Sequence, residues 1–240
     1  MILTELTLTR IITVYGAQGF LFIFSLYLAY RIISRENKKL NYIFAAFYIF
    51  EAIGLLINFI YAPIPDPAIV KVLNFITNFF SFYAPIFLLV FILILLRSEK
   101  AITPRIQIAI FLIYGIALFS MIFIAYIPEM GVTIHTPSGA PQWGLAFFLY
   151  LTIIVSIFST IPTLYFSWRI YTQFEDQKLK DRWRYFLGGC IVLYGFLYSI
   201  FINNTTDPNS AIRTIIAVIG LILTVSASVL LYYGVGRQLD

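Results

Sequence analysis

The sequence is poor in charged residues. Its 240 residues include 16 lysines and arginines and 11 aspartates and glutamates, or 11% of the chain, whereas about a quarter of the residues of a soluble domain are charged. Apolar residues make up 61% and aromatic residues 18% of the chain. This composition is typical of a membrane protein, in which hydrophobic segments face lipid.

Histidine and cysteine are each present once, as His135 and Cys190. A zinc or haem site with several histidines is therefore excluded, as is an internal disulfide, and we expect no metal and no cofactor. Cys190 is expected to be a small packing residue. The last apolar segment lacks lysine, which excludes a retinal Schiff base there. No phosphate loop, nucleotide-binding glycine motif or serine–histidine constellation is present, so we expect no catalytic residue and no enzyme activity.

Seven apolar segments are long enough to cross a bilayer, which takes an α-helix of about 20 residues. Because backbone polar groups find no water in hydrocarbon, each segment is predicted to be a helix. The expected fold is an all-α integral membrane protein, a seven-transmembrane-helix bundle that forms a single domain over residues 1–240. The expected spans are 11–32, 41–62, 69–96, 105–127, 144–170, 184–203 and 211–234.

Basic residues are distributed unevenly along this chain. Thirteen of the sixteen follow the first, third and fifth spans or lie in the C-terminal tail, whereas Arg10, Lys71 and Arg213 belong to the other side. The positive-inside rule then predicts an outside N-terminus and a cytoplasmic C-terminus, in a multi-pass protein of the cell membrane. No basic face stands clear of the bilayer, so no nucleic-acid partner is expected. The tryptophans fall at predicted span ends and are expected to be interfacial anchors: Trp143, Trp168 and Trp183.

Two short patterns occur twice. Asp-Pro stands before an apolar run at 66–67 and again at 207–208, and Asp as N-cap with Pro in the first turn predicts a helix start at both places. "AYRIISRENKKLN" at 29–41 also matches "SWRIYTQFEDQKLKD" at 167–181, each with an aromatic–Arg–Ile exit and a polar linker. These matches are compatible with a 3+1+3 parallel repeat, and equally with two independently capped helices.

Prolines and polar stretches predict where helices are interrupted or joined. Pro85 and Pro162 fall near the middle of the third and fifth spans, where each removes a backbone donor and is expected to kink its helix. The Gly- and Pro-rich stretch 128–144 is expected to be a lid or a plain exposed loop. The polar stretch 172–184 is expected to dock a cytoplasmic partner or to be a linker held at anionic headgroups.

Glu51 is the one carboxylate well inside a predicted span. A group at this depth must be protonated, paired or exposed to a wet cavity. Polar residues accompany it at helical spacing on two neighbouring spans, with Glu51, Gly54 and Asn58 on one face of the second and Lys71, Asn74, Asn78 and Ser81 along the third.

If these two faces meet, they form a polar cleft in the outer half of the membrane. Arg213 could reach this cleft from the outer rim as a counter-charge to Glu51 or to an anionic ligand. The candidate ligand-binding residues are Glu51, Asn58, Lys71, Asn74, Asn78 and Arg213. The alternative is that such groups only hydrogen-bond one helix to another. That alternative is favoured for the asparagines taken alone. It is also favoured for the small and hydroxylated residues of the fifth and seventh spans, which are Thr152, Ser156, Ser159 and Thr163, and Ala217, Gly220, Thr224 and Ser228.

Two segments carry a family resemblance. "VKVLNFITNFFSFYAPIFLLVFILILLRSEK" at 70–100 is an aromatic-rich helix with a central proline and an apolar run that closes on a basic turn, and "YRIISRENKKLNYIFAAFYIFEAIGLLINF" at 30–59 is a basic linker with a second helix. Both resemble the seven-transmembrane sensor region at the N-terminus of many histidine kinases. The resemblance implies a receptor-like sensor. With no kinase domain before its end at Asp240, the chain is expected to be a stand-alone module that signals through a partner.

Three hypotheses about function follow. The first is a membrane sensor that binds a small ligand or membrane cue in the polar cleft and signals through a cytoplasmic or membrane protein. The second is a small-solute facilitator similar to the SWEET type, which shares the 3+1+3 layout and the outside N-terminus. Those proteins carry a proline in the first helix of each triplet, whereas here the fifth span has Pro162 and the first span has none. The third is an accessory subunit that packs against other membrane helices.

Overall fold

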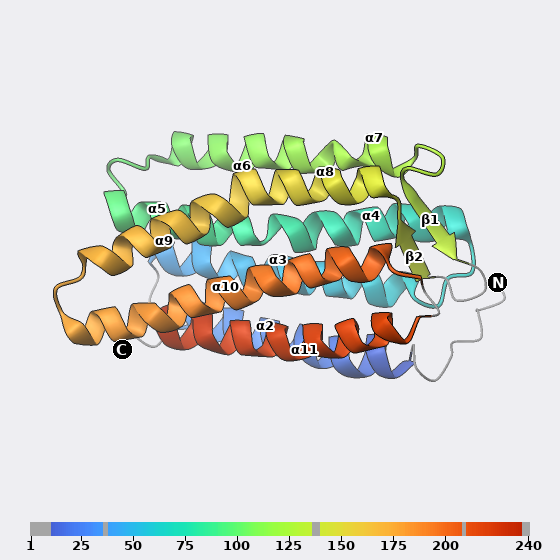
Figure 1. Ribbon diagram of the computed structural model, residues 1–240. Helices are drawn as coiled ribbons and strands as arrows, with labels where there is room; N and C mark the ends of the chain where they lie inside the picture. The colour runs from blue at the N-terminus through green and yellow to red at the C-terminus, as the bar shows by residue number, and fades with distance from the viewer. Residues whose placement is uncertain (1–10, 36–37, 136–139, 208–209, 237–240) are drawn as a thin grey trace.

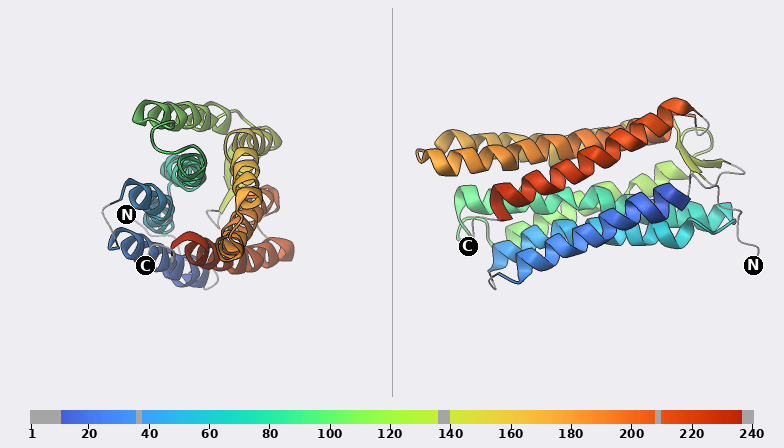
Figure 2. Two further views of the ribbon diagram at one scale, coloured as in Figure 1. Left: turned by 90° about the vertical axis from the view of Figure 1, so that its left-hand side faces the viewer. Right: turned by 90° about the horizontal axis from the view of Figure 1, so that it is seen from below.

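The structure, a computed structural model, describes residues 11–35, 38–135, 140–207 and 210–236. Figure 1 shows long helices that run along one common axis, with α6 on one side of the bundle and α11 on the opposite side, as the end-on view of Figure 2 also shows. Within the described residues, seven helices are long and apolar enough to cross a membrane. Each of the seven predicted segments is thus helical and long and apolar enough to cross a membrane.

Several spans consist of consecutive helical elements, some of them π-helical (η). The first four spans are η1 (Ile12–Gln18) with α2 (Gly19–Ile33), α3 (Lys39–Tyr61), α4 (Pro67–Tyr83) with α5 (Pro85–Arg97), and α6 (Pro104–Phe119) with α7 (Met121–Ala125). The last three are α8 (Leu145–Val155), η2 (Ser156–Thr160) and α9 (Ile161–Gln173), then α10 (Gln177–Thr205), then α11 (Ala211–Leu231) with η3 (Tyr232–Gly236).

The outer surface of the bundle is apolar. Large hydrophobic side chains such as Ile23, Phe123 and Leu145 are about two thirds or more exposed. A soluble monomer rarely exposes apolar patches of this extent. The surface and the seven apolar helices therefore fit a multi-pass protein in a lipid bilayer.

The two ends of the bundle differ in charge. We call the end with the α5–α6 and α9–α10 connections the basic end, and the end with the β-hairpin the hairpin end (Figure 1). Among the described basic residues, Lys71 and Arg213 belong to the hairpin end and the others to the basic end. Arg10 and Arg237 lie outside the described residues.

The hairpin replaces the loop that the sequence predicted at 128–144. Strand β1 (Val132–His135) pairs antiparallel with β2 (Ala140–Trp143), with Val132 opposite Trp143. Trp143 is 3% exposed and packs against the rings of Phe82 and Phe147. The prediction that Trp143 is an interfacial anchor is therefore wrong, because the hairpin folds it into the core.

The other two tryptophans differ from each other in exposure. Trp183 is 2% exposed and lies inside the bundle, so the anchor prediction is wrong for it as well, whereas Trp168 is 57% exposed on the outer surface. Position near the end of a span therefore did not determine whether a ring faces lipid or protein.

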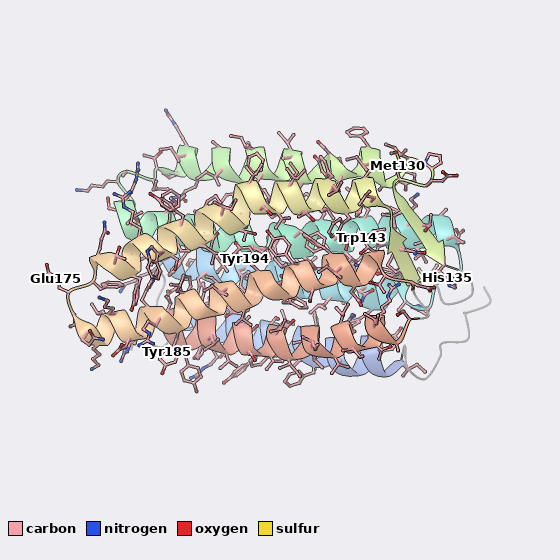
Figure 3. The ribbon with its side chains drawn as sticks, in the orientation of Figure 1. Met130, His135, Trp143, Glu175, Tyr185 and Tyr194 are labelled. Atoms are coloured by element: carbon pink, nitrogen blue, oxygen red, sulfur yellow. The ribbon has the colours of Figure 1, made fainter. Side chains whose placement is uncertain are left out.

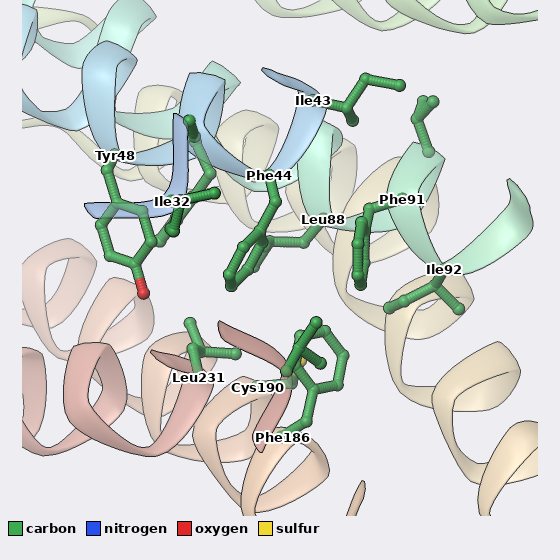
Figure 4. Packing of buried hydrophobic residues seen from close by; sticks show 14 of the residues in the cluster. Ile32, Ile43, Phe44, Tyr48, Leu88, Phe91, Ile92, Phe186, Cys190 and Leu231 are labelled. Carbon is green, nitrogen blue, oxygen red and sulfur yellow. The ribbon is translucent and has the colours of Figure 1, made fainter. Parts of the chain in front are cut away.

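Aromatic side chains fill the bundle between the helices of the basic half. The ring centroids of Phe44 and Phe91 lie 5.1 Å apart, and those of Phe91 and Phe186 lie 6.0 Å apart. Cys190 and Leu231 pack beside them and are fully buried (Figure 4). Cys190 is thus a packing residue, as predicted.

The two Asp-Pro sites start helices differently. Asp66 caps α4 as predicted, since its Oδ1 accepts hydrogen bonds from the backbone nitrogens of Ala68 at 2.8 Å and Ile69 at 3.3 Å. For Asp207 the prediction is wrong, because α11 begins at Ala211 and its N-cap is Ser210. Serine caps as well as aspartate does, and the Ser210 backbone nitrogen donates to the Asp207 carbonyl oxygen, which makes a turn before the helix.

Of the two interpretations of 172–184, the linker is wrong for most of the stretch, which is helical, and the cytoplasmic partner stays a prediction. Asp176 accepts hydrogen bonds from the backbone nitrogens of Lys178 and Leu179, and so α10 begins at Gln177. The regular α-helix is interrupted near both prolines: α4 ends at Tyr83 and α5 begins at Pro85, while π-helix η2 ends at Thr160, two residues before Pro162. A proline cannot donate to the preceding turn, so the helix is broken or widened there.

Candidate functional site

Glu51 lies in the middle of α3 with its carboxyl group inside the bundle. Its Oε1 is buried and has no hydrogen-bond partner among the described residues. Asn58 of α3 donates a hydrogen bond to Gln18 of η1. The first span and α3 are antiparallel, so the residue seven positions after Gln18 lies level with the residue seven positions before Asn58. These residues are Ser25 of α2, which is buried, and Glu51. Glu51 therefore does not turn outward toward lipid.

Helices α3 and α4 approach closely one turn from Glu51. A Cβ atom at Gly54 would lie 3.3 Å from the backbone oxygen of Thr77 and 3.4 Å from the backbone nitrogen of Ser81. The two helices thus meet at Gly54 and Ser81, one residue from each predicted polar face. The hydroxyl oxygen of Thr77 is a second buried atom without a hydrogen-bond partner among the described residues.

The asparagines of α4 form a short chain of hydrogen bonds that reaches α3. Asn78 donates through Nδ2 to Oδ1 of Asn74 at 3.1 Å, and Asn74 donates to the hydroxyl oxygen of Tyr61, at the end of α3, also at 3.1 Å. Both asparagines are buried. With the Asn58–Gln18 bond, these contacts show that Asn58 and Asn74 join helices in this structure, which was the alternative interpretation, whereas the Asn78 bond lies within α4.

Lys71 does not extend toward Glu51. Its Nζ lies 4.5 Å from the ring centroid of Tyr126, just after α7. Lys71 is the fifth residue of α4, near the hairpin end, and a long side chain there lies on a neighbouring ring with its charge near the membrane surface. Lys71 and Asn74 belong to the same helix, but their side chains contact different partners, Tyr126 and Tyr61.

Arg213 also lies apart from Glu51. Its Nη2 donates to the backbone oxygen of Pro141 at 2.9 Å, and its Nη1 donates to the backbone oxygen of Thr206 at 3.4 Å. The expected pairing of Arg213 with Glu51 is therefore not formed, because carbonyl oxygens of β2 and of the residue after α10 lie beside the start of α11. Arg213 holds the hairpin against the ends of α10 and α11.

A second polar group lies at η2, where α8 and α9 meet α10. Tyr194 shares a hydrogen bond with Ser159 at 2.9 Å and donates to Thr163 at 3.0 Å. Tyr198 makes the same kind of contacts, with Ser156 at 2.6 Å and Thr160 at 2.9 Å. The prediction that these hydroxyls mark a helix contact is confirmed for Ser156, Ser159 and Thr163, whereas Thr152 bonds within its own helix.

Sequence reasoning missed Gln18, Ser25 and Thr77. Gln18 and Ser25 are seven residues apart in the first span, a spacing that places both on one helical face, and this was the available signal. Thr77 carried no comparable signal, because a threonine in an apolar helix commonly bonds to its own backbone.

No family model matches the chain, and no curated protein matches it either.

Proposed function

We propose that the chain is a receptor-like membrane sensor that takes a small ligand at Glu51, between α2, α3 and α4. One observation carries the proposal: the Oε1 atom of Glu51 is buried at mid-span and has no donor in the part of the chain that the structure describes. An unsatisfied polar group inside a membrane protein is costly, and ionisable residues at this depth are commonly functional. The complementary ligand is a small molecule that donates hydrogen bonds through an ammonium or hydroxyl group.

The proposed orientation places the basic end in the cytoplasm of the cell and the hairpin end outside. The clustering of the described lysines and arginines at one end supports it. The Asn58, Asn74 and Asn78 contacts would then lie between the outside and Glu51, on the side from which an external ligand arrives.

Helix α3 supplies the route from this site to the basic end. Tyr48 donates a buried hydrogen bond to the backbone oxygen of Ser228 in α11 at 3.2 Å, and Phe44 packs on Phe91 of α5. A ligand that favours one position of α3 would shift these contacts, provided that it binds the two arrangements with different affinity. A protein partner at the basic end would detect the shift.

The facilitator hypothesis predicts a path for solute through the bundle. Large buried side chains fill both halves instead, including Phe44 and Leu88 toward the basic end and Tyr114 and Phe147 toward the hairpin end. This packing favours the sensor. Liposomes that contain the purified protein are therefore expected to show no flux of sugars or amino acids above that of empty liposomes.

The direct test measures thermal unfolding in lipid nanodiscs against a panel of protonated amines, amino acids and polyols. A ligand at a hundred times its Kd stabilises the folded state by about 2.7 kcal/mol. We expect such a stabilisation with the wild-type protein and with Glu99→Gln, a control at an exposed carboxylate of the basic end. Glu51→Gln should lose it while its own stability changes by no more than about 1 kcal/mol, since the carboxyl oxygen has no partner to lose. An equal ligand effect on Glu51→Gln and the wild type would contradict the proposal.

A further inference from the structure

A cavity of about 400 Å³ lies within the basic end of the bundle. Its volume is in the range of small-molecule sites, roughly 300–1,000 Å³. The lining comes from the start of α3, the ends of α5 and α9, the start of α10, and η3. Glu51 does not line it, so an inference about this cavity stands apart from the proposed function.

The walls of the cavity are mostly apolar, and its one charged lining residue, Lys38, is exposed. Phe91, Ile170 and Trp183 are buried lining residues, whereas Leu95 and Leu179 are about 40% exposed and mark the side toward the surface. Three polar residues complete the lining, which are Lys38, Asn41 and Gln173. All the lining residues belong to the described part of the chain, and Lys38 is the one charged group among them.

The start of α3 adds positive potential at the same place. Lys38 is the residue before the first turn, and Leu40 and Asn41 of that turn also line the cavity. The N-cap residue, Lys38, makes no capping hydrogen bond with its side chain, and the first turn of the helix has no acidic residue. The positive end of the helix dipole and the Lys38 ammonium group therefore both favour an anion at the rim.

We propose that this cavity binds an anionic amphiphile with one hydrocarbon chain. Its carboxylate or phosphate head lies at Lys38 and the first turn of α3, and its chain lies against Phe91, Ile170 and Trp183. The volume, near the lower end of the range for ligand sites, favours one chain over two. Charge at the rim and apolar surface within correspond to the two parts of such a molecule.

Trp183 offers a direct readout of this site. Its Nε1 donates to the backbone oxygen of Ser167 at 2.8 Å, and its ring lies 4.6 Å from that of Phe186, so the indole is held in one place. Bromine quenches indole fluorescence only at short range. Trp168 is 57% exposed on the outer surface and reports on bromine that is merely dissolved in the bilayer.

The test titrates bromoundecanoate into zwitterionic nanodiscs that hold either of two proteins. One protein keeps Trp183 alone (Trp143→Phe, Trp168→Phe) and the other keeps Trp168 alone (Trp143→Phe, Trp183→Phe). We expect saturable quenching of Trp183 and unsaturated quenching of Trp168. Dodecanoate or dodecyl phosphate should reverse the Trp183 quenching at a mole fraction in the bilayer about tenfold below that of dodecanol. Whichever of these two anions competes at the lower mole fraction shows whether the site prefers a carboxylate or a phosphate head group.

Two adjacent lysines supply the matched control. Lys38→Gln should raise the half-saturating concentration of bromoundecanoate about fivefold, the upper effect of an exposed ion pair, while Lys39→Gln, whose side chain does not line the cavity, should leave it unchanged. Leu179→Phe, at the exposed side, should also weaken binding by narrowing the cavity. Unsaturated quenching of Trp183, equal competition by dodecanol, or equal effects of the two lysine variants would each overturn the proposal.

Discussion

Gly189 of α10 lies so close to Leu231 of α11 that a Cβ atom at position 189 would come within 2.8 Å of the Leu231 backbone nitrogen. Gly234 makes a similar contact with the backbone of Phe186, since a Cβ atom at position 234 would lie 2.7 Å from the Cα atom of Phe186. Small residues allow helix backbones to approach in this way inside membranes, where packing rather than water drives helix association. Gly188, the preceding residue, has no neighbour that a Cβ atom would meet within 4 Å.

Adding one methyl group at Gly189 or at the adjacent Gly188 should therefore change the free energy of unfolding differently. Gly189→Ala should lower the free energy of unfolding by about 1–3 kcal/mol, since the two helices must separate. Gly188→Ala should leave it unchanged or raise it by up to about 1 kcal/mol, because alanine favours the helix. Reversible unfolding in mixed micelles, followed by circular dichroism, measures both. Equal values for the two variants would show that α10 and α11 are not in this contact.

Substitution of Tyr194 tests the cluster of hydroxyl side chains at η2. Figure 3 shows Tyr194 within the bundle and Tyr185 of the same helix on the outside, where it is 54% exposed. Tyr194→Phe removes the shared partner of Ser159 and Thr163 and leaves buried hydroxyls unpaired, so it should lower the free energy of unfolding by about 1–3 kcal/mol. The control Tyr185→Phe should change it by less than about 0.5 kcal/mol. A Tyr194→Phe protein as stable as this control would contradict the described contacts.

Arg213 tests how the hairpin is held. Arg213→Gln removes a charged donor to the Pro141 carbonyl oxygen, a hydrogen bond of about 1.5–3 kcal/mol. Cleavage within 128–144 by a non-specific protease should then become about tenfold faster, since it follows the population of the open hairpin. Lys71→Gln, which removes a charge at the same end but leaves the hydrogen bond to Pro141, should be cleaved at nearly the wild-type rate. Identical cleavage rates for the wild type and Arg213→Gln would exclude this role.

The seven spans and their two breaks could be predicted from the sequence because they depend on local physics. Apolar length determines where a helix can cross lipid, and Pro85 and Pro162 interrupt the helices in which they stand. Helix starts were harder to predict. Asp66 and Asp207 look alike in sequence, but a competing cap at Ser210 moves the start of α11, and Asp176 extends α10 into a stretch that looked like a linker.

The candidate site was predicted in part, for a similar reason. Helical spacing placed Gly54 toward α4, but it could not show which partner a long side chain would choose. Lys71 lies on the ring of Tyr126 and Arg213 bonds to the hairpin, and both partners are distant in sequence. Asn58 pairs with Gln18 for the same reason, since the two residues meet only when α3 packs against the first span.

The account depends most on one orientation, in which the basic end faces the cytoplasm and the hairpin end faces outward. Single cysteines on a Cys190→Ala background test it in intact cells, with Lys178→Cys at the basic end, Thr133→Cys in the hairpin, and a membrane-impermeant maleimide as the reagent. The account predicts that the reagent labels Thr133→Cys in intact cells and labels Lys178→Cys only after the membrane is permeabilised. Labelling of Lys178→Cys in intact cells, or of both positions from the same side, would contradict it.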